Sequence, residues 1–235
     1  GYPRASIQAS AALDLTVASS QHLRNWLIEQ AGANKAVEVC TTNIDAKHWD
    51  PDRFDSSALR ADLGITEDVP VILYAGRLTQ QKQPRVFAEC MRRLGEGSNF
   101  VCIVAGDGEY REYLEEYIQR YGLHFVKLLG SVENSRMSEL LALSDIFFLP
   151  SEMEGISLAI YEAMAMRCAI VGARVGGQAE LVTSDTGFLV DHGAHEIQDY
   201  VAALSQLVSD KDFCQRMALH ARLRVQAHFA IETMG

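Results

Sequence analysis

Glu154 and Glu162 are the residues whose type and spacing first suggest chemistry, because seven residues separate two carboxylates around the start of a helical pattern. An apolar run precedes them, and Gly155 and Ser157 follow Glu154. Small residues at a helix start let backbone N–H groups approach a phosphate, which the helix dipole also favours. The glutamates are about two helical turns apart, so they can reach different parts of one elongated ligand. An isolated acidic pair of this kind is more often two solvated helix carboxylates.

Two basic residues follow another apolar run. Arg77 comes directly after Gly76 at the end of the run 71–75, and Lys82 lies five residues further on. A fork-shaped guanidinium and a compact ammonium at the end of a strand suit a diphosphate. The alternative is an exposed turn with solvated basic residues, and this pair alone does not decide between the two.

The turn from Gly106 to Gly108 follows a third apolar run. A dinucleotide-binding turn of the GxGxxG type would have a third glycine where Arg111 stands. It would also be followed, at the end of the next strand, by an acid for the ribose, where this chain has Gly130 and Ser131. These differences exclude a nicotinamide dehydrogenase, and a tight strand-to-helix turn explains most of the pattern.

Two patterns resemble metal sites but do not predict one. His192 and His195 lie in a loop with no third ligand suggested nearby. Asp50 and Asp52 form an Asp-x-Asp pair in a polar stretch, away from the end of any buried strand. We expect all four to be solvated loop residues, and we expect no metal and no cofactor.

Composition sets the class of protein. The formal net charge is −10, and such a chain repels phosphate backbones and anionic lipid, so nucleic acid is not an expected partner. The five cysteines include no CxxC pair, and Cys102 and Cys168 lie in apolar runs, which predicts buried free thiols and a reducing compartment. The residues given contain no signal-peptide pattern and no apolar run of about 18 residues. We expect a cytoplasmic protein.

Short apolar runs alternate with segments of helical period, which predicts an α/β fold with a doubly wound, Rossmann-like parallel sheet. The expected strands are 13–17, 36–40, 69–75, 100–105, 125–129, 146–149, 169–171 and 188–190. The expected helices are 21–31, 84–94, 111–121, 137–143, 158–166, 197–208 and 212–228. In such a sheet ligands bind outside the carboxyl ends of the strands, where all the turns described above lie.

We expect three parts along the chain. Residues 1–40 are interpreted as the incomplete tail of an upstream domain, 41–68 as a polar connector, and 69–235 as the Rossmann-like domain. Because the chain begins without Met and within an apparent structural element, it is interpreted as a fragment of a longer protein.

Taken in order, these pieces resemble glycosyltransferase family 4 over almost the whole chain. The ordered matches are Asn43-Ile44-Asp45, Gly76-Arg77-Leu78 with Lys82, Gly106-Asp107-Gly108, Pro150-Ser151, Glu154 to Glu162, Gly176-Gly177 with Glu180, and Gly187-Phe188-Leu189-Val190. The most specific is the Glu-x7-Glu pattern. The resemblance implies the C-terminal, donor-binding half of a retaining, metal-independent enzyme with the two-domain GT-B fold. On this resemblance, 1–40 would be the incomplete tail of the upstream acceptor domain and 69–235 the nucleotide-sugar-binding Rossmann-like domain.

The resemblance also implies roles for individual residues. Arg77 and Lys82 would hold the diphosphate and stabilise it as it leaves, so that they and Glu154 are the implied catalytic residues. Glu162 would bind the ribose and Glu154 the hydroxyls of the sugar. The rest of the implied donor site lies in the turns, at Gly76, Gly106, Gly130, Ser131, Val132, Gly155, Ile156, Ser157 and Leu158.

The chain departs from the family pattern at three positions. Arg167 and Ala169 stand where the family usually has a glycine and a proline, and Ser157 stands where it often has a glycine. These changes affect loop shape and the fit of the sugar.

We therefore expect transfer of a hexosyl unit from a nucleotide-diphosphate sugar to a sugar, lipid or protein acceptor. Two alternatives stay open, a nucleotide-sugar epimerase of related fold and a non-catalytic nucleotide-sugar-binding module. The fragment alone is expected to be inactive. Any membrane contact, at the cytoplasmic face, would be made through the missing upstream domain.

Overall fold

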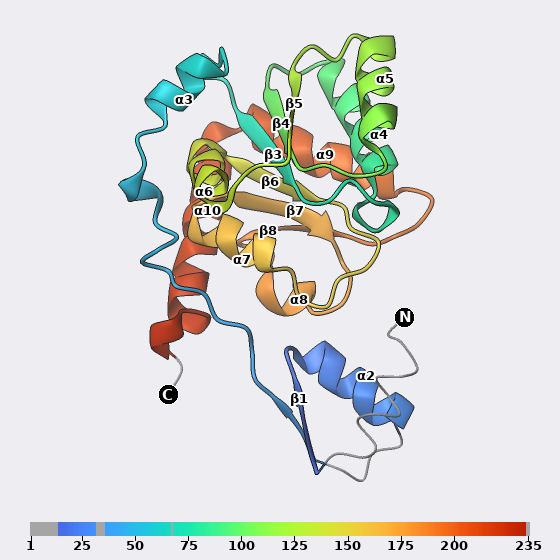
Figure 1. Ribbon diagram of the computed structural model, residues 1–235, viewed down its shortest axis with the longest axis vertical. Helices are drawn as coiled ribbons and strands as arrows, with labels where there is room; N and C mark the ends of the chain where they lie inside the picture. The colour runs from blue at the N-terminus through green and yellow to red at the C-terminus, as the bar shows by residue number, and fades with distance from the viewer. Residues whose placement is uncertain (1–13, 32–35, 67, 234–235) are drawn as a thin grey trace.

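The computed structural model describes residues 14–31, 36–66 and 68–233 (Figure 1). Its main body is a six-stranded parallel sheet with the strand order β5-β4-β3-β6-β7-β8. The strands are β3 (Val71–Ala75), β4 (Val101–Ala105), β5 (Val126–Gly130), β6 (Ile146–Leu149), β7 (Ala169–Ala173) and β8 (Gly187–Val190). The chain builds outward from β3 to β5, then returns to place β6 on the other side of β3. The strand order therefore reverses between β3 and β6.

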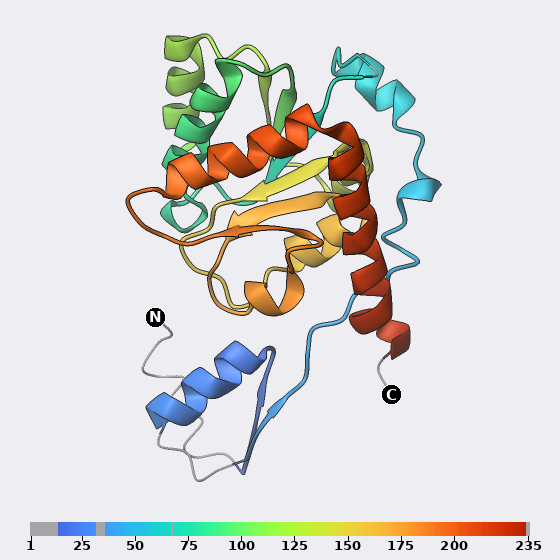
Figure 2. The ribbon, with the colours of Figure 1, turned by 180° about the vertical axis from the view of Figure 1, so that it is seen from behind.

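Helices cover both faces of this sheet, which is why its strands are almost continuously apolar. Along β3, Val71, Leu73 and Ala75 belong to one core and Ile72 and Tyr74 to the other, as the alternation of a strand requires. The first face is covered by α6 (Asn134–Leu143), α7 (Leu158–Ala165) and the end of α10 (Lys211–His228). The second is covered by α4 (Pro84–Gly95), α5 (Arg111–Tyr121) and α9 (Glu196–Ser209), with the start of α10 (Figure 2).

A small unit precedes the sheet. It consists of β1 (Leu15–Ala18), α2 (Gln21–Ala31) and β2 (Ala36–Val39), with the two strands paired in parallel. It has a core of its own, formed by Ala18, Leu27 and Val37. In both ribbon views the unit lies beyond the end of the sheet where α8 (Gln178–Leu181) is found. Position 13, the expected first residue of β1, lies outside the described residues.

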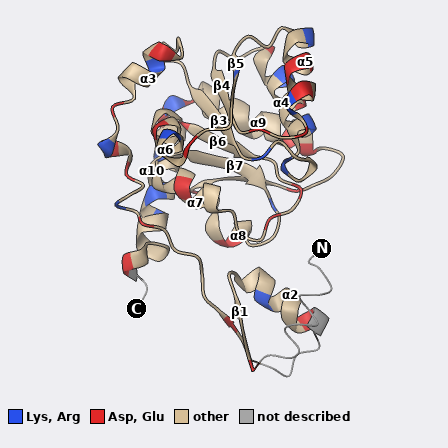
Figure 3. Ribbon diagram, in the orientation of Figure 1, with Lys and Arg blue, Asp and Glu red and all other residues tan. Residues whose placement is uncertain are grey.

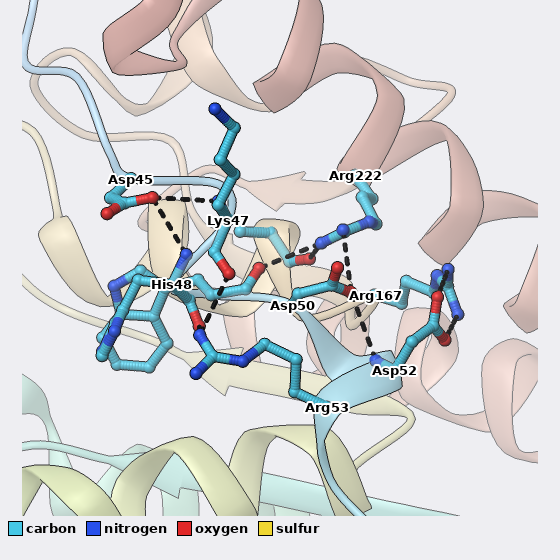
Figure 4. Close-up of polar contacts among 10 residues, drawn as sticks. Asp45, Lys47, His48, Asp50, Asp52, Arg53, Arg167 and Arg222 are labelled. Atoms are coloured by element: carbon cyan, nitrogen blue, oxygen red, sulfur yellow. Dashed lines mark hydrogen bonds and ion pairs between the residues drawn. The ribbon is translucent and has the colours of Figure 1, made fainter.

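The connector between the two parts is fastened by ion pairs (Figure 4). Asp50 accepts a hydrogen bond from the backbone of Asp52 at the start of the short helix η1 (Pro51–Arg53), and its carboxylate lies 2.9 Å from Nη2 of Arg222. Asp52 accepts two hydrogen bonds from Arg167, at 2.7 and 2.8 Å. Asp52 is exposed, as expected, but it is paired with an arginine from the turn after α7. Asp50 is only partly exposed, because an arginine of α10 reaches it, so the expectation of a solvated residue is wrong there.

The expected strands and long helices agree with the structure to within a few residues. The helix expected from 137 begins three residues earlier, at Asn134. Two helices were not expected, α3 (Ser57–Asp62) inside the connector and the four-residue α8. Cys102 and Cys168 are buried and free, as expected.

Three further features of the described residues concern membrane-spanning helices, groups of metal ligands and charged side chains. None of the helices in the described ranges is long and apolar enough to cross a membrane. No group of three or more potential metal ligands occurs in the part of the chain that is described. His192 instead lies beside Glu196, with Nδ1 and Oε2 2.8 Å apart. Both acidic and basic residues occur along α4 and α5 (Figure 3). Some form ion pairs within one helix, such as Arg92 with Glu89 and Arg111 with Glu115.

Candidate functional site

The loops that follow β3 and β6 meet at the carboxyl edge of the sheet. The backbone N–H of Glu152 donates to the carbonyl of Gln81 at 2.8 Å, and the side-chain amide of Gln81 donates to the carbonyl of Met153 at 2.8 Å. Ligands of doubly wound sheets bind in the crevice at the point where the strand order reverses, which here lies between these two strands. In this fold a ligand site is therefore expected at these two loops.

An ion pair joins the two loops. Lys82, from the loop after β3, donates from Nζ to the carboxylate of Glu154, from the loop after β6. Only 17% of the Lys82 side chain and 10% of the Glu154 side chain are exposed. Partly buried charges of this kind need a partner, and each of these two side chains compensates the other. The sequence suggested both residues, and the structure brings them together.

Glycines allow the strand ends to approach closely beside this pair. A Cβ at Gly106, whose φ is +155°, would lie 1.9 Å from the carbonyl oxygen of Gly76. The backbone N–H of Gly106 also donates to the carbonyl of Gly130 at 2.8 Å, so the ends of β3, β4 and β5 form one continuous surface. The side-chain carbons of Lys82 pass over Gly76, where a Cβ would be 3.7 Å from Cε. Only glycine fits at position 106 without moving the neighbouring strand.

Arg77 differs from Lys82 in its surroundings. Its side chain is exposed, and among the described residues it takes part in no hydrogen bond or ion pair. The carbonyl of Arg77 accepts from the N–H of Thr79 at 2.8 Å, which keeps the turn compact. Arg77 thus lies next to Gly76 at the edge of the site, with a guanidinium available to a ligand.

The remaining loop residues lead into α7. Gly155 and Ile156 are partly buried, Ser157 is buried at the N-cap, and Leu158 begins the helix with 59% of its surface exposed. The side chain of Ser157 makes no capping hydrogen bond, so no capping side chain uses the N–H groups of Leu158 and Ala159, the first two of α7. Backbone N–H groups in this position suit an anionic ligand.

Glu162 lies on α7 one turn beyond its first residues and is half-buried. Burial raises the pKa of its carboxyl from 4.5 to about 7. No opposite charge contributes to this shift, in contrast to Glu154, which is paired. A buried carboxyl poised near neutrality at the mouth of a sheet is a common feature of ligand sites.

The turn after β5 lies at the outer end of the same edge. Ser131 is exposed, and Val132 packs partly against the core beneath the sheet. The hydrogen bond between Gly106 and Gly130 connects this turn to the end of β4, which pairs with β3, the strand that Arg77 and Lys82 follow. Sequence reasoning missed Gln81, which donates to the carbonyl of Met153 and accepts from the N–H of Glu152. Contacts with backbone groups of this kind leave no signal in a motif.

A separate cavity of about 210 Å³ lies at the opposite edge of the sheet, beside Pro70 and Asp145. Asp145 precedes β6, and burial raises the pKa of its carboxyl. Its carboxylate accepts the N–H of Val71 at 2.8 Å, which closes the amino end of β3. This edge holds the starts of the strands, where doubly wound folds rarely bind ligands.

Comparison with known proteins decides the family. Residues 55–224 match the profile of the family described as glycosyl transferases group 1. The chain belongs to this family. Its α/β architecture, with helices on both faces of a six-stranded parallel sheet, matches that of GT-B glycosyltransferases and confirms the expected fold class.

Curated members of the group 1 family resemble this chain over most of its length. Sulfoquinovosyl transferase SQD2 of Arabidopsis thaliana is 31% identical over 208 residues, which are 86% of this chain and 39% of that protein. D-inositol 3-phosphate glycosyltransferase of Nocardia farcinica is 31% identical over 91% of this chain and 49% of its own length. The chain thus spans half or less of these relatives.

A solved structure extends the likeness to three dimensions. The structure of Anabaena Alr3699/HepE in complex with UDP-glucose superimposes with a TM-score of 0.87, at 26% identity, over 98% of this chain and 64% of that one. A glycosyltransferase from Rickettsia africae gives a TM-score of 0.84 at 20% identity, over 99% of this chain and 64% of that one.

Proposed function

We propose that this chain supplies the donor site of a retaining glycosyltransferase of family 4, which transfers a hexosyl unit from a nucleotide-diphosphate sugar. The observation that carries this proposal is the ion pair between Lys82 and Glu154 across the point where the strand order reverses. Membership of the group 1 family and the likeness to a structure that holds UDP-glucose support it.

In this proposal the diphosphate of the donor lies between Arg77 and Lys82. The ammonium of Lys82 turns from Glu154 towards the phosphate oxygens, and the exposed guanidinium of Arg77 adds a second set of donors. The N–H groups at 155–158, at the start of α7, face the same anion. Glu154, released from Lys82, accepts hydrogen bonds from hydroxyls of the sugar, and Glu162 accepts them from the ribose. The turn at Gly130, Ser131 and Val132 borders the base.

In this proposal the reaction depends on positive side chains that lie where negative charge develops on the leaving group. The bond between the anomeric carbon and the diphosphate oxygen breaks as a bond to the acceptor oxygen forms, and the hydroxyl proton of the acceptor passes to the leaving diphosphate. The leaving group gains negative charge, which Arg77 and Lys82 stabilise in the place that a metal ion takes in other enzymes. We propose retention of the anomeric configuration, and the acceptor is a sugar, a lipid or a protein.

A thermal-shift screen of UDP-, GDP- and ADP-sugars tests the proposal. A ligand present at 100 times its dissociation constant stabilises a protein by about 2.7 kcal/mol. We expect one nucleotide series to stabilise the wild-type chain and to lose that effect in Glu162→Ala. Glu116→Ala, which removes an exposed carboxylate of α5, is the matched control. The proposal fails if every series leaves the wild type unchanged, or if Glu162→Ala responds like the control.

A further inference from the structure

Helix α2 begins on a carboxylate from a distant part of the chain. Oε2 of Glu180 accepts from the N–H of Gln21 at 2.8 Å, and Oε1 accepts from the N–H of His22 at 2.7 Å. The next N–H, that of Leu23, donates to Oγ of Ser20 at 3.1 Å. The first turn of α2 has no acidic residue of its own. Glu180 therefore provides the negative charge that the N-terminal end of a helix favours.

Glu180 is itself fixed to the main body. Its carbonyl accepts from Nη2 of Arg224 at 2.8 Å, and the carbonyl of Leu181 accepts from Nε of the same arginine at 2.8 Å. Burial, together with a smaller contribution from the charge of Glu180, raises the pKa of Tyr161 on α7 to about 12. The backbone at Glu180 is thus held by α10, and the carboxylate lies near enough to α7, the helix that carries Glu162, to affect Tyr161.

The turn at 176–177, before Glu180, also contacts the loop after β6 that contains Glu154 and Gly155, which we call the donor loop. The N–H of Gly177 donates to the carbonyl of Gly155 at 2.6 Å. A Cβ at Gly176, where φ is +55°, would lie 1.9 Å from the carbonyl oxygen of Glu154. On its other side, a Cβ at Gly177 would lie 2.8 Å from Cβ of Ser20. The turn at 176–180 is therefore wedged between the start of α2 and the loop that holds Glu154.

We infer that Glu180 is a positioning residue that fastens the β1–α2–β2 unit to the sheet and couples the position of that unit to the donor loop. The contacts form an unbroken series, from the first N–H groups of α2 through Glu180 and Gly177 to Gly155 and the paired Glu154. Movement of the small unit away from the sheet has to break the two hydrogen bonds to Glu180 and remove support from the turn at 176–177. Only the ligand-binding consequence of this inference rests on the proposed function.

Amide hydrogen exchange by NMR on the 235-residue chain tests the inference without a ligand. Glu180→Gln keeps the size of the side chain but replaces one acceptor with an NH₂ group that faces an N–H donor. We expect the amides of Gln21 and His22 to exchange about tenfold faster or more in this variant, as an unfavourable end of a helix opens more often. The amide of Gly177 should also exchange faster, while those of β3 and β6 stay unchanged.

Two further variants make the result specific. Asp185→Asn removes an exposed carboxylate from the turn before β8 and should leave all these rates at wild-type values. Glu180→Asp keeps the charge on a shorter side chain and should restore part of the protection. Wild-type exchange at Gln21 and His22 in Glu180→Gln would show that the carboxylate does not fasten α2. Unchanged exchange at Gly177 would show that the donor loop is not coupled to it.

A UDP titration of the same samples separates this inference from the proposed function. We expect Glu180→Gln to bind UDP about fivefold or more weakly than the wild type and the Asp185→Asn control, a change typical of coupled sites. An unchanged dissociation constant in Glu180→Gln would contradict the coupling. Absence of UDP binding to the wild type would count against a uridine donor, while the exchange rates would still decide whether Glu180 positions α2 and the loop.

Discussion

At the scale of single residues, the proposed role of Glu162 in ribose binding predicts that nucleotide affinity depends on pH. Its pKa is raised to about 7 by burial, and ribose hydroxyls donate hydrogen bonds to an ionised carboxylate more strongly than to a neutral one. We therefore expect nucleotide affinity to fall by up to about fivefold as pH decreases from 7 to 6. Calorimetric titrations between pH 6 and 8 measure this change. Glu162→Gln should bind weakly with little dependence on pH, and an equal dependence in both proteins would assign the titration to another group.

The same group should destabilise the fold above neutral pH. Because its folded-state pKa exceeds 4.5, the native protein binds this proton more tightly than the unfolded chain. The resulting stabilisation is complete below pH 4.5 and is lost as pH rises through about 7. Glu162→Gln should thus increase the free energy of unfolding by about 1–3 kcal/mol at pH 8 and much less at pH 5. Urea denaturation at both pH values tests this, and equal effects would refute it.

Residue types and spacing alone could predict that Lys82 and Glu154 belong to one site, because each follows a buried strand and such strands share a carboxyl edge. The direct pairing of the two side chains could not be predicted, since it depends on β6 lying next to β3 and not next to β5. The individual roles of Arg77 and Glu162 stay predictions. The contact of Glu180 with α2 could not be predicted from any local sequence pattern, because the partners lie 158 and 159 positions apart in the chain.

At the scale of elements, the connector depends on one buried arginine of α10. Arg222, whose side chain is 7% exposed, donates to the carbonyls of Trp49, at 2.9 Å, and Ala165, and also pairs with Asp50. Arg222→Leu leaves a carboxylate and two carbonyls without their donor. We expect a loss of about 3 kcal/mol in the free energy of unfolding, at the low end for a buried pair because Asp50 is partly exposed.

Urea denaturation of Arg222→Leu and of Arg216→Leu measures this contribution. Arg216 is an exposed residue of the same helix, so its replacement should change stability by less than about 0.5 kcal/mol. Similar losses in both variants would show that the connector is not anchored by Arg222.

Arg167 illustrates how a departure from a family pattern is accommodated. Its φ is +60°, in the left-handed region that favours the glycine usual at this position. The bidentate contact with Asp52 offsets part of the strain, but both side chains are well exposed. Arg167→Ala loses the ion pair and keeps the strain, whereas Arg167→Gly loses both. We expect the glycine variant to be more stable than the alanine variant by about 1 kcal/mol, measured by urea denaturation. A more stable alanine variant would contradict this.

Elements with strong periodicity could be predicted from the sequence, and short ones could not. Apolar runs such as 71–75 and 146–149 indicate strands buried on both faces. The 18 residues of α10 are enough for a helical period to be recognised in the sequence. The six residues of α3 and the four of α8 are too few for a helical period to be seen. The connector looked unstructured because its anchors, Arg167 and Arg222, lie more than 100 residues away along the chain.

At the scale of the whole molecule, strand order places the candidate donor site. Reversal of the strand order between β3 and β6 brings the two loops of the site to one edge of the sheet. Helix α10 runs from one face of the sheet to the other. After it, the chain meets the connector through the bridge of Ile44 with Ala230. The small β1–α2–β2 unit meets this same edge through Glu180. The boundaries 1–40, 41–68 and 69–235 stay predictions.

The central claim is that the carboxyl edge of this sheet holds a diphosphate, and calorimetry on Lys82→Ala tests it most directly. The nucleotide series selected in the thermal-shift screen supplies two ligands, the nucleoside diphosphate and the bare nucleoside. Each charge-assisted hydrogen bond contributes roughly 1.5–3 kcal/mol. Lys82→Ala should therefore weaken binding of the nucleoside diphosphate by at least about tenfold and hardly change binding of the bare nucleoside. Lys47→Ala, at an exposed ion pair with Glu232, should leave both unchanged. Equal weakening of the two ligands in Lys82→Ala would contradict the claim.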